Sequence, residues 1–238
     1  MSFRWEIENL YQNQDISSGS SLPISAYMPT IRKEMKGGVL TTDAISELYA
    51  NRIVYFASQF DDNSCTAAQA QLLYLDANVE DPQRSEIKMY VNSGGGSVTA
   101  GLALYNTMQN IHSEVVTIGM GMCASMGAFL LCTGSPGRRF AYHDTTIMIH
   151  QPSWGVQGTH RHIKAHTKFG DNLYDLMLGI MAAHCHRTFE EMEAAVAEDN
   201  FLTAEEALKF GLIDKIVPTP EGKKRIVPCK PLVPQSQR

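Results

Sequence analysis

Residues 87–97 read IKMYVNSGGGS, an apolar run that ends in three consecutive glycines and a serine. The run from Ile87 to Val91 predicts a strand, residues 92–96 predict a loop, and the following stretch predicts a helix from about Ser97 to Gln109. A similar unit precedes it, with a strand at residues 53–56 and a helix at 64–77. Repeated strand-helix units of this length imply a largely parallel sheet with crossover helices, so the predicted fold class is α/β.

A third unit begins with the β-branched run at residues 115–118, turns at Gly121 and enters a helix that contains Ser125. Residues 115–133 carry no charge and approach the length of a membrane span. Glycines and a serine interrupt this stretch, so a buried strand, turn and helix is the favoured interpretation. A further strand is expected at residues 146–149.

The regions outside these units divide the chain into a domain and two extensions. We expect a flexible extension at residues 1–22, a folded domain at 23–217 and a proline-rich basic tail at 218–238. Near the start of the domain, residues 32–38 predict a charged loop and residues 42–50 a short helix.

A long helix is expected at residues 162–185. Its apolar residues keep to one side at the helical period, which predicts a surface that docks on a partner; they are Phe169, Leu173, Leu176, Met177, Ile180 and Met181. Two later helices begin with capping boxes, Thr188 with Glu191 and Thr203 with Glu206, and Gly211 ends the second.

Composition excludes several classes of function. The chain has 238 residues, of which 44% are hydrophobic, and a net charge of −5 with scattered Lys and Arg, so we expect one globular unit that binds no nucleic acid. The first residues lack a secretory signal, which predicts a cytoplasmic protein. Five cysteines without paired spacing predict reduced thiols in the core.

Two glycine-rich segments are candidates for chemistry. Residues 94–97 could present bare amides to an oxyanion or could simply form a tight turn; they match no phosphate-binding motif. Residues 121–128, GMCASMGA, place Ser125 between a strand and a helix, as in a nucleophile elbow, where the Met126 amide could stabilise an oxyanion. A helix of small residues packed on a sheet is the alternative.

A histidine and a carboxylate could complete such a site. His150 ends the strand at 146–149, where sites of α/β sheets gather, and Asp199 precedes a helix in a loop that could fold back. The residues alone leave Asp199 as one acid among many. The other histidines, such as His162 and His166, lack partners at ligand spacing, so we expect no metal site.

Three passages together resemble the proteolytic subunit of Clp protease: residues 90–101, residues 121–128, and Met148 to Pro152. The similarity runs from about Arg52 to Val217. It implies a crotonase-like fold, the Clp protease domain at residues 23–217, and a particle of two stacked heptameric rings. It further implies a serine endopeptidase that degrades unfolded polypeptides delivered by an AAA+ unfoldase, without a cofactor of its own because the unfoldase consumes the ATP.

The resemblance also assigns roles to residues. Ser125 is the implied nucleophile, His150 the general base and acid, and Asp199 the orienting carboxylate, with the amides of Gly96 and Met126 as the oxyanion hole. The helix at residues 162–185 corresponds to the helix that interlocks the two rings, and residues 155–158 to an inter-ring strand. Substrate is expected along Gly95, Ser97, Val98, Gln151 and Pro152, and the unfoldase at Tyr90 and Phe140.

The chain departs from the family pattern at three places. Gly94 replaces a proline, Ala197-Glu198 replaces an acidic-basic pair that bridges the rings, and Lys88 stands where an aromatic docking residue is common. Gly94 and Ala197-Glu198 motivate a second hypothesis, a subunit that needs a paralogue to form working double rings, whereas Lys88 bears on which unfoldase binds. A third hypothesis is an acyl-CoA enzyme of the related crotonase fold, which also binds an oxyanion with paired amides.

Overall fold

The structure is a computed structural model that describes residues 29–36, 38–79 and 85–226. It divides into two units, residues 1–47 and 48–238, which are taken separately below. The predicted flexible extension at residues 1–22 lies outside the described residues, as do residues 227–238 of the predicted tail.

The first unit contains an antiparallel hairpin of β1 (Thr30–Met35) and β2 (Gly38–Asp43). The prediction of a charged loop at residues 32–38 is therefore wrong. The side chains of this hairpin are almost all exposed, so neither strand has the apolar face by which a sequence pattern reveals a strand. After the hairpin, the Asp43 carboxylate accepts from the Ser46 amide and starts α1 (Ala44–Ala50), two residues later than predicted.

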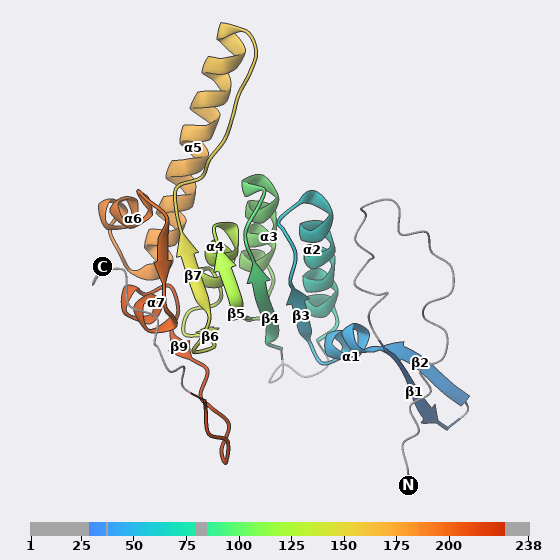
Figure 1. The fold of residues 1–238 in the computed structure, drawn as a ribbon. Coiled ribbons are helices and arrows are strands. Elements are labelled where there is room, and N and C mark those ends of the chain that lie inside the picture. The colour runs from blue at the N-terminus through green and yellow to red at the C-terminus, as the bar shows by residue number, and fades with distance from the viewer. Residues whose placement is uncertain (1–28, 37, 80–84, 227–238) are drawn as a thin grey trace, which may run out of the picture. The chain divides into compact units, whose positions relative to one another are not determined.

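The second unit is built on a parallel sheet, as predicted. Its strands are β3 (Ile53–Phe56), β4 (Ile87–Ser93), β5 (Val115–Ala124), β6 (Arg139–Ala141) and β9 (Lys215–Ile216), hydrogen-bonded in that order. Helices α2 (Asp62–Ala77), α3 (Val98–Asn110) and α4 (Met126–Cys132) cover one face of this sheet (Figure 1). The core lies between them, where Leu72, Leu104 and Phe129 are fully buried.

An irregularity in β5 lets two further strands join the same sheet. The first half of β5 pairs with β4 and β6, whereas Met122 to Ala124 pair with β7 (Thr146–Ile149), which also pairs antiparallel with β8 (Asn200–Leu202). Gly121 adopts a φ of 61° at this irregularity, and the Asn92 side chain accepts from the Met122 amide at 3.2 Å. After the register shift Cys123 still pairs with Ser93 of β4, and β5 leads directly into the start of α4.

Helix α5 (His160–Cys185) packs on the body only through its C-terminal half, and its N-terminal half projects outward (Figure 1). Its buried side chains are those of Met177, Leu178, Met181, Ala182 and Cys185. The predicted single apolar side is wrong in part, because Phe169 and Leu176 are 52% and 49% exposed. These two residues lie on a different side of the helix from the buried stripe.

The last elements follow their predicted end signals. Capping boxes at Thr188–Glu191 and Thr203–Glu206 start α6 (Phe189–Val196) and α7 (Ala204–Phe210), and Gly211 ends α7 with a φ of 98°. In the ranges that the structure describes, no helix is both long enough and apolar enough to cross a bilayer. Four cysteines are buried free thiols, as predicted, and Cys229 lies outside the described residues.

Candidate active site

The glycine loop after β4 is clamped by the backbone of Phe60. The Phe60 amide donates to the Gly95 carbonyl at 2.9 Å, and the Ser97 amide donates to the Phe60 carbonyl at 2.7 Å. These bonds pass on either side of the Gly96 amide, which is left without an acceptor among the described residues. Gly96 has a φ of 144°, and a Cβ there would lie 2.4 Å from the Phe60 carbonyl oxygen. Glycine is therefore required at position 96 by backbone conformation and by close approach.

Ser125 occupies a strained turn between β5 and α4. Its φ of 55° and ψ of −122° lie in a region that non-glycine residues rarely adopt. Its amide donates to the Met148 carbonyl at 2.9 Å, and its carbonyl accepts from Phe129 in the first turn of α4. Met126 follows as the first residue of α4, so its amide has no intrahelical acceptor.

Close packing holds this turn beside the glycine loop. A Cβ at Gly95 would lie 2.6 Å from Cβ of Ser125, and one at Gly127 would lie 2.4 Å from the Ser93 carbonyl oxygen. The small residues around Ser125 therefore let α4 approach the end of β4. This packing confirms the closely packed small-residue helix, and the turn at Ser125 has a geometry that a nucleophile elbow would also require.

His150 and Asp199 form the opposite side of the site. The imidazole Nδ1 lies 3.1 Å from Asp199 Oδ1, where a hydrogen bond joins the end of β7 to the residue before β8. The antiparallel pairing of Ile149 with Asn200 brings these two segments together. If Nδ1 carries the proton and donates to the carboxylate, the lone pair is on Nε2. The His150 side chain is 26% exposed and that of Asp199 is 64% exposed.

A cavity of about 250 Å³ brings the two sides together. Of the residues predicted for the site, Gly96, Val98, Ser125, His150 and Pro152 line it. The Ser125 hydroxyl forms no hydrogen bond with any described residue, so the serine and the imidazole face one cavity without being joined.

Three residues predicted to bind substrate have other contacts. Gly95 supplies its amide to the Ser93 hydroxyl at 3.2 Å, and Ser97 caps α3 by accepting from the Ala100 amide at 3.3 Å. Gln151 is tied to the end of α6, where its amide donates to the Val196 carbonyl at 2.9 Å. These residues support the cavity and do not line it.

The rest of the lining consists of Gly94, Met148, Ile149, Ser153, Met177 and Met181. Gly94 belongs to the glycine loop that the sequence marks as a candidate for oxyanion binding, but sequence reasoning gives the other five no role in the site. The two methionines belong to the apolar stripe of α5 that the sequence does predict. A periodic pattern does not indicate, however, that this part of α5 lies beside Ser125. The clamp by Phe60 has no sequence signal, because it is made by backbone atoms.

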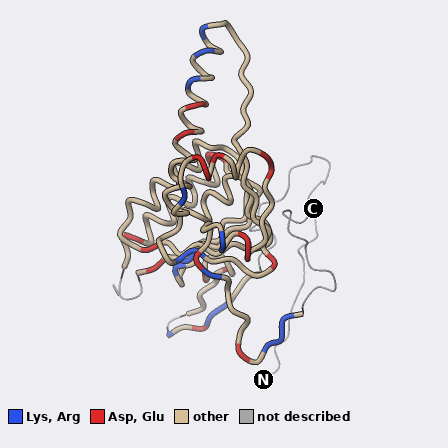
Figure 2. Tube along the Cα trace, turned by 90° about the vertical axis from the view of Figure 1, so that its left-hand side faces the viewer, with Lys and Arg blue, Asp and Glu red and all other residues tan. Residues whose placement is uncertain are grey.

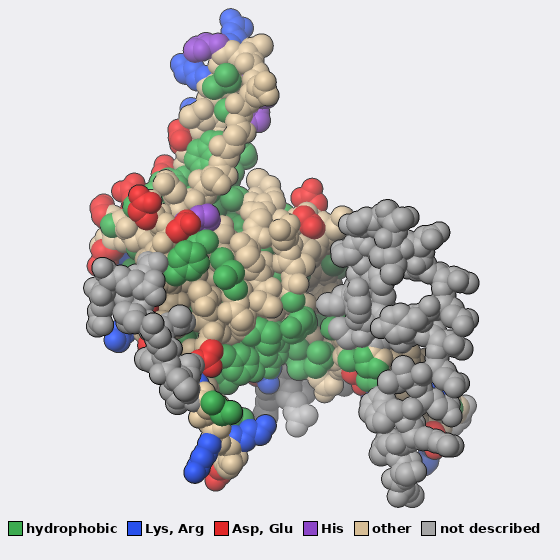
Figure 3. Space-filling model, in the orientation of Figure 1, with side chains coloured by type: hydrophobic (Ala, Val, Ile, Leu, Met, Phe, Trp, Pro, Cys, Tyr) green, Lys and Arg blue, Asp and Glu red, His purple; other side chains and the backbone are tan. Residues whose placement is uncertain are grey.

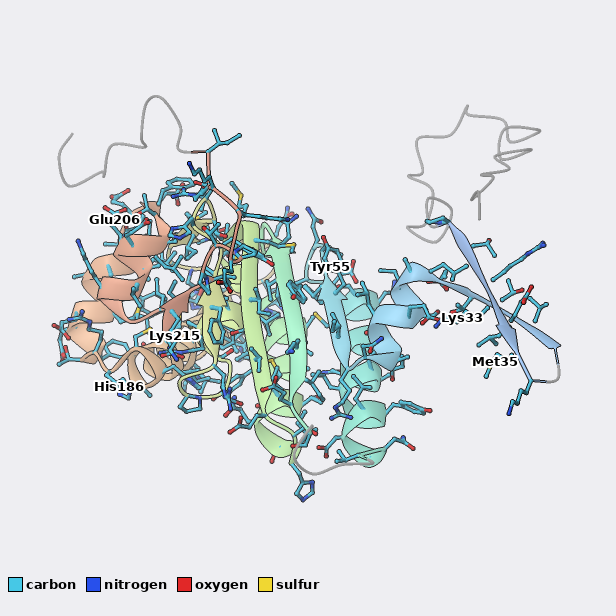
Figure 4. All side chains as sticks on the ribbon, turned by 90° about the horizontal axis from the view of Figure 1, so that it is seen from below. Lys33, Met35, Tyr55, His186, Glu206 and Lys215 are labelled. Carbon is cyan, nitrogen blue, oxygen red and sulfur yellow. The ribbon has the colours of Figure 1, made fainter. Side chains whose placement is uncertain are left out.

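Tyr90 and Phe140 lie away from the cavity, on the exposed face of the sheet. Cross-strand register aligns Tyr55 with Tyr90, Tyr90 with Ile118, and Ile118 with Phe140. Apolar side chains gather on this face (Figure 3), and the row continues to Lys215 on β9, which Figure 4 labels together with Tyr55 on β3.

Within the described part of the chain, no group of three or more His, Cys, Asp or Glu side chains is placed to hold a metal ion. The rings of His162 and His166 contact each other near the tip of α5 in a tilted arrangement, with ring centroids 4.1 Å apart.

The model of a known family, described as Clp protease, matches residues 36–220 of this sequence. The chain belongs to the Clp protease family. The matched range includes the glycine loop, Ser125, His150 and Asp199, and the mixed α/β architecture fits this family. The protein is thus a peptidase of the Clp type.

Proposed function

We propose that this Clp protease chain is a serine endopeptidase subunit that uses Ser125, His150 and Asp199 to cleave unfolded polypeptides. Three features support this proposal together: the strained backbone of Ser125, the amides of Gly96 and Met126, which have no acceptor among the described residues, and the hydrogen bond between Asp199 and His150, which lines one cavity with Ser125. Strain of this kind persists where the surrounding structure enforces it, and it is concentrated at active sites.

The proposed reaction follows from the positions of these groups. The Ser125 hydroxyl attacks the peptide carbonyl carbon while His150 Nε2 takes its proton, and Asp199 stabilises the imidazolium that forms. The negative carbonyl oxygen is held by the two amides. His150 then protonates the leaving amine as the C–N bond breaks, and water hydrolyses the acyl-enzyme by the same route. This chemistry uses no cofactor and no metal.

The observation that carries the proposal is the hydrogen bond of His150 Nδ1 to Asp199 Oδ1, because it leaves Nε2 for the serine. Ser125 and His150 line the same cavity without a hydrogen bond between them. Hydrogen bonds between catalytic groups are often long or misaligned before substrate binds.

Assembly is part of the proposed function. The exposed Phe169 and Leu176 give α5 an apolar surface that a second ring could cover, in keeping with two stacked heptameric rings. Residues 155–158, expected to act as an inter-ring strand, form no strand within the single chain. We propose that they pair only in the assembled particle, which would act in the cytoplasm.

The apolar row on the exposed sheet face is the proposed docking surface for an AAA+ unfoldase, which would supply unfolded chains at the expense of ATP. Tyr55 at the edge of this row is 39% exposed, and apolar residues in such a contiguous patch commonly mark a protein interface. Tyr90 and Phe140 contribute to the row from neighbouring strands.

A subunit that requires a paralogue remains the second candidate. It is favoured by Ala197-Glu198, where an ionic bridge between rings would otherwise form. The backbone carbonyl of Ala197 accepts a hydrogen bond from the Gln151 side chain at 3.2 Å, within the same chain. Light scattering of the purified chain separates the two candidates, since a stable double ring with peptidase activity would remove the need for a paralogue.

Covalent labelling tests the nucleophile. A fluorophosphonate should label the assembled wild-type protein and fail to label Ser125→Ala. Ser58→Ala is the matched control, because the site uses only the backbone carbonyl of Ser58, which accepts from the Ser93 hydroxyl at 2.5 Å. An assembled, folded wild-type protein that stays unlabelled would contradict the proposed function.

A further inference from the structure

Residues 151–159, termed the strap, connect the active site to the tip of α5. The strap begins directly after His150 and runs beside the projecting half of α5, as Figures 1 and 2 both show. Pro152 and Ser153 at its start line the cavity next to Ser125. The position of the strap therefore determines one wall of the site.

The backbone of the strap is held only at its two ends. The Gln151 backbone amide donates to the Val196 carbonyl at the end of α6, and the Thr159 carbonyl accepts from the Ile163 amide at 2.9 Å in the first turn of α5. Within the described residues, no backbone hydrogen bond involves residues 152–158. Side-chain packing must therefore keep the middle of the strap on the helix.

Trp154 provides that packing by resting on Gly170 of α5. A Cβ at Gly170 would lie 2.5 Å from Cε2, 2.6 Å from Cζ2 and 2.8 Å from Nε1 of the indole. The indole thus covers the bare Cα of Gly170, which is buried although its neighbours on the helix are exposed. A Cβ at position 170 would force the ring to shift from this place.

A second, smaller contact lies nearer the tip. Gly158, with a φ of 150°, sits against the ring of His162, where a Cβ would lie 2.8 Å from Cδ2. His162 in turn contacts the ring of His166. The strap is therefore seated on α5 at two points, in each case by a ring placed against a glycine.

We infer that Trp154 and Gly170 form a latch that positions the strap and, through it, the Pro152–Ser153 wall of the substrate cavity. Trp154 is a positioning residue, since it touches α5 and no group that reacts. An extended substrate requires this wall, whereas a small reagent that reacts with Ser125 does not. Opening the latch should weaken the use of long peptides and leave the nucleophile reactive. This inference rests on the proposed peptidase function.

Gly170→Ala tests the latch, and Gly179→Ala in the same helix is its matched control because no atom lies within 4 Å of a Cβ there. Both changes raise helix propensity equally.

Both variants are made in a Trp5→Phe background, which leaves Trp154 as the single tryptophan. In the assembled protein, Gly170→Ala should increase acrylamide quenching of Trp154 fluorescence and lower kcat/KM for a long fluorogenic peptide about tenfold, mainly through KM. Gly179→Ala should change neither by more than about twofold, and fluorophosphonate labelling should persist in both.

Trp154→Ala, alone and combined with Gly170→Ala, separates a latch from a steric clash. A latch predicts that either single change causes the same loss and that the double variant loses no more, because both open one contact. Normal kinetics in Trp154→Ala, with recovery in the double variant, would overturn the inference, as would unchanged fluorescence and kinetics in Gly170→Ala. Absence of labelling in the wild type would instead count against the proposed function, and the fluorescence result would still report on the latch.

Discussion

Two aspartates in this molecule each receive a hydrogen bond from a basic side chain, and the two pairs differ in almost every other respect. Asp214 faces Arg139, whose side chain is 5% exposed and donates to both carboxylate oxygens, at 2.9 Å from Nε and 2.6 Å from a terminal nitrogen. Asp199 is 64% exposed and has one bond, to His150. The first pair is surrounded by further partners, and the second faces a cavity.

The difference indicates which pair serves the fold and which serves the chemistry. The other terminal nitrogen of Arg139 donates to the carbonyls of Cys132, His184 and Gly211, so one guanidinium connects α4, α5 and the end of α7. Burial by itself raises the pKa of Asp214, but the bonds from Arg139 outweigh it and the net pKa is lowered. His150 and Asp199 hold no such junction together, so their replacement should leave the fold intact.

Of the substitutions considered, Asp199→Asn should have the largest effect. It should lower peptidase activity and leave stability unchanged. An amide cannot stabilise the imidazolium and favours the wrong histidine tautomer, so kcat should fall about 10⁴-fold. The free energy of unfolding should change by no more than about 0.5 kcal/mol because the side chain is exposed. Peptidase assays and denaturant unfolding measure the two quantities.

Glu198→Gln is the control for this change, since it removes a neighbouring exposed carboxylate and should alter kcat less than about twofold. Wild-type activity in Asp199→Asn would exclude Asp199 as the orienting carboxylate.

Asp214→Asn should have the opposite outcome, a loss of stability. It leaves a nearly buried guanidinium without its counter-charge, and breaking such a pair by removing one partner costs about 3–5 kcal/mol. Asp144→Asn is the matched control, because it breaks an exposed ion pair, with Arg225, that should contribute about 0–1 kcal/mol. Equal stabilities of the two variants in urea unfolding would remove the distinction between a structural and a functional aspartate.

The sequence predicts the parts of this molecule whose signals are local. Apolar runs, glycines and capping boxes predict β3, β4, β7 and the starts of the main helices to within about two residues. The short strands β6, β8 and β9 are not predicted, and β5 continues six residues beyond its predicted end. That error matters for the site, because the extra residues pair with β7 about 24 positions later and direct the chain toward Ser125. Pairing over such a distance leaves no periodic pattern to detect.

The candidate site is predicted in the same uneven way. Residue types and a family resemblance place Ser125, His150 and Asp199 together, and the hydrogen bond between the last two is consistent with that placement. The clamp by Phe60 and the seat of Trp154 on Gly170 escape prediction, since each depends on a backbone that approaches another element closely. A glycine in a sequence can indicate that the backbone is closely approached, but it does not indicate which element approaches it.

Structural and functional positions can also be compared within the glycine loop. Gly94 and Gly96 should respond differently to replacement by alanine. Gly96→Ala would drive a Cβ into the Phe60 backbone and displace an amide of the proposed oxyanion hole, which should lower kcat about 10²–10³-fold. Gly94→Ala introduces a Cβ with no atom within 4 Å, and φ there is outside the left-handed region. It should therefore leave kcat nearly unchanged. It should also raise the free energy of unfolding by about 0.4–1 kcal/mol, because alanine reduces the conformational entropy of the unfolded chain. Peptidase assays and urea unfolding of both variants decide this. Similar losses of kcat in both would mean that loop flexibility at Gly94, and not the clamp on Gly96, governs the oxyanion site.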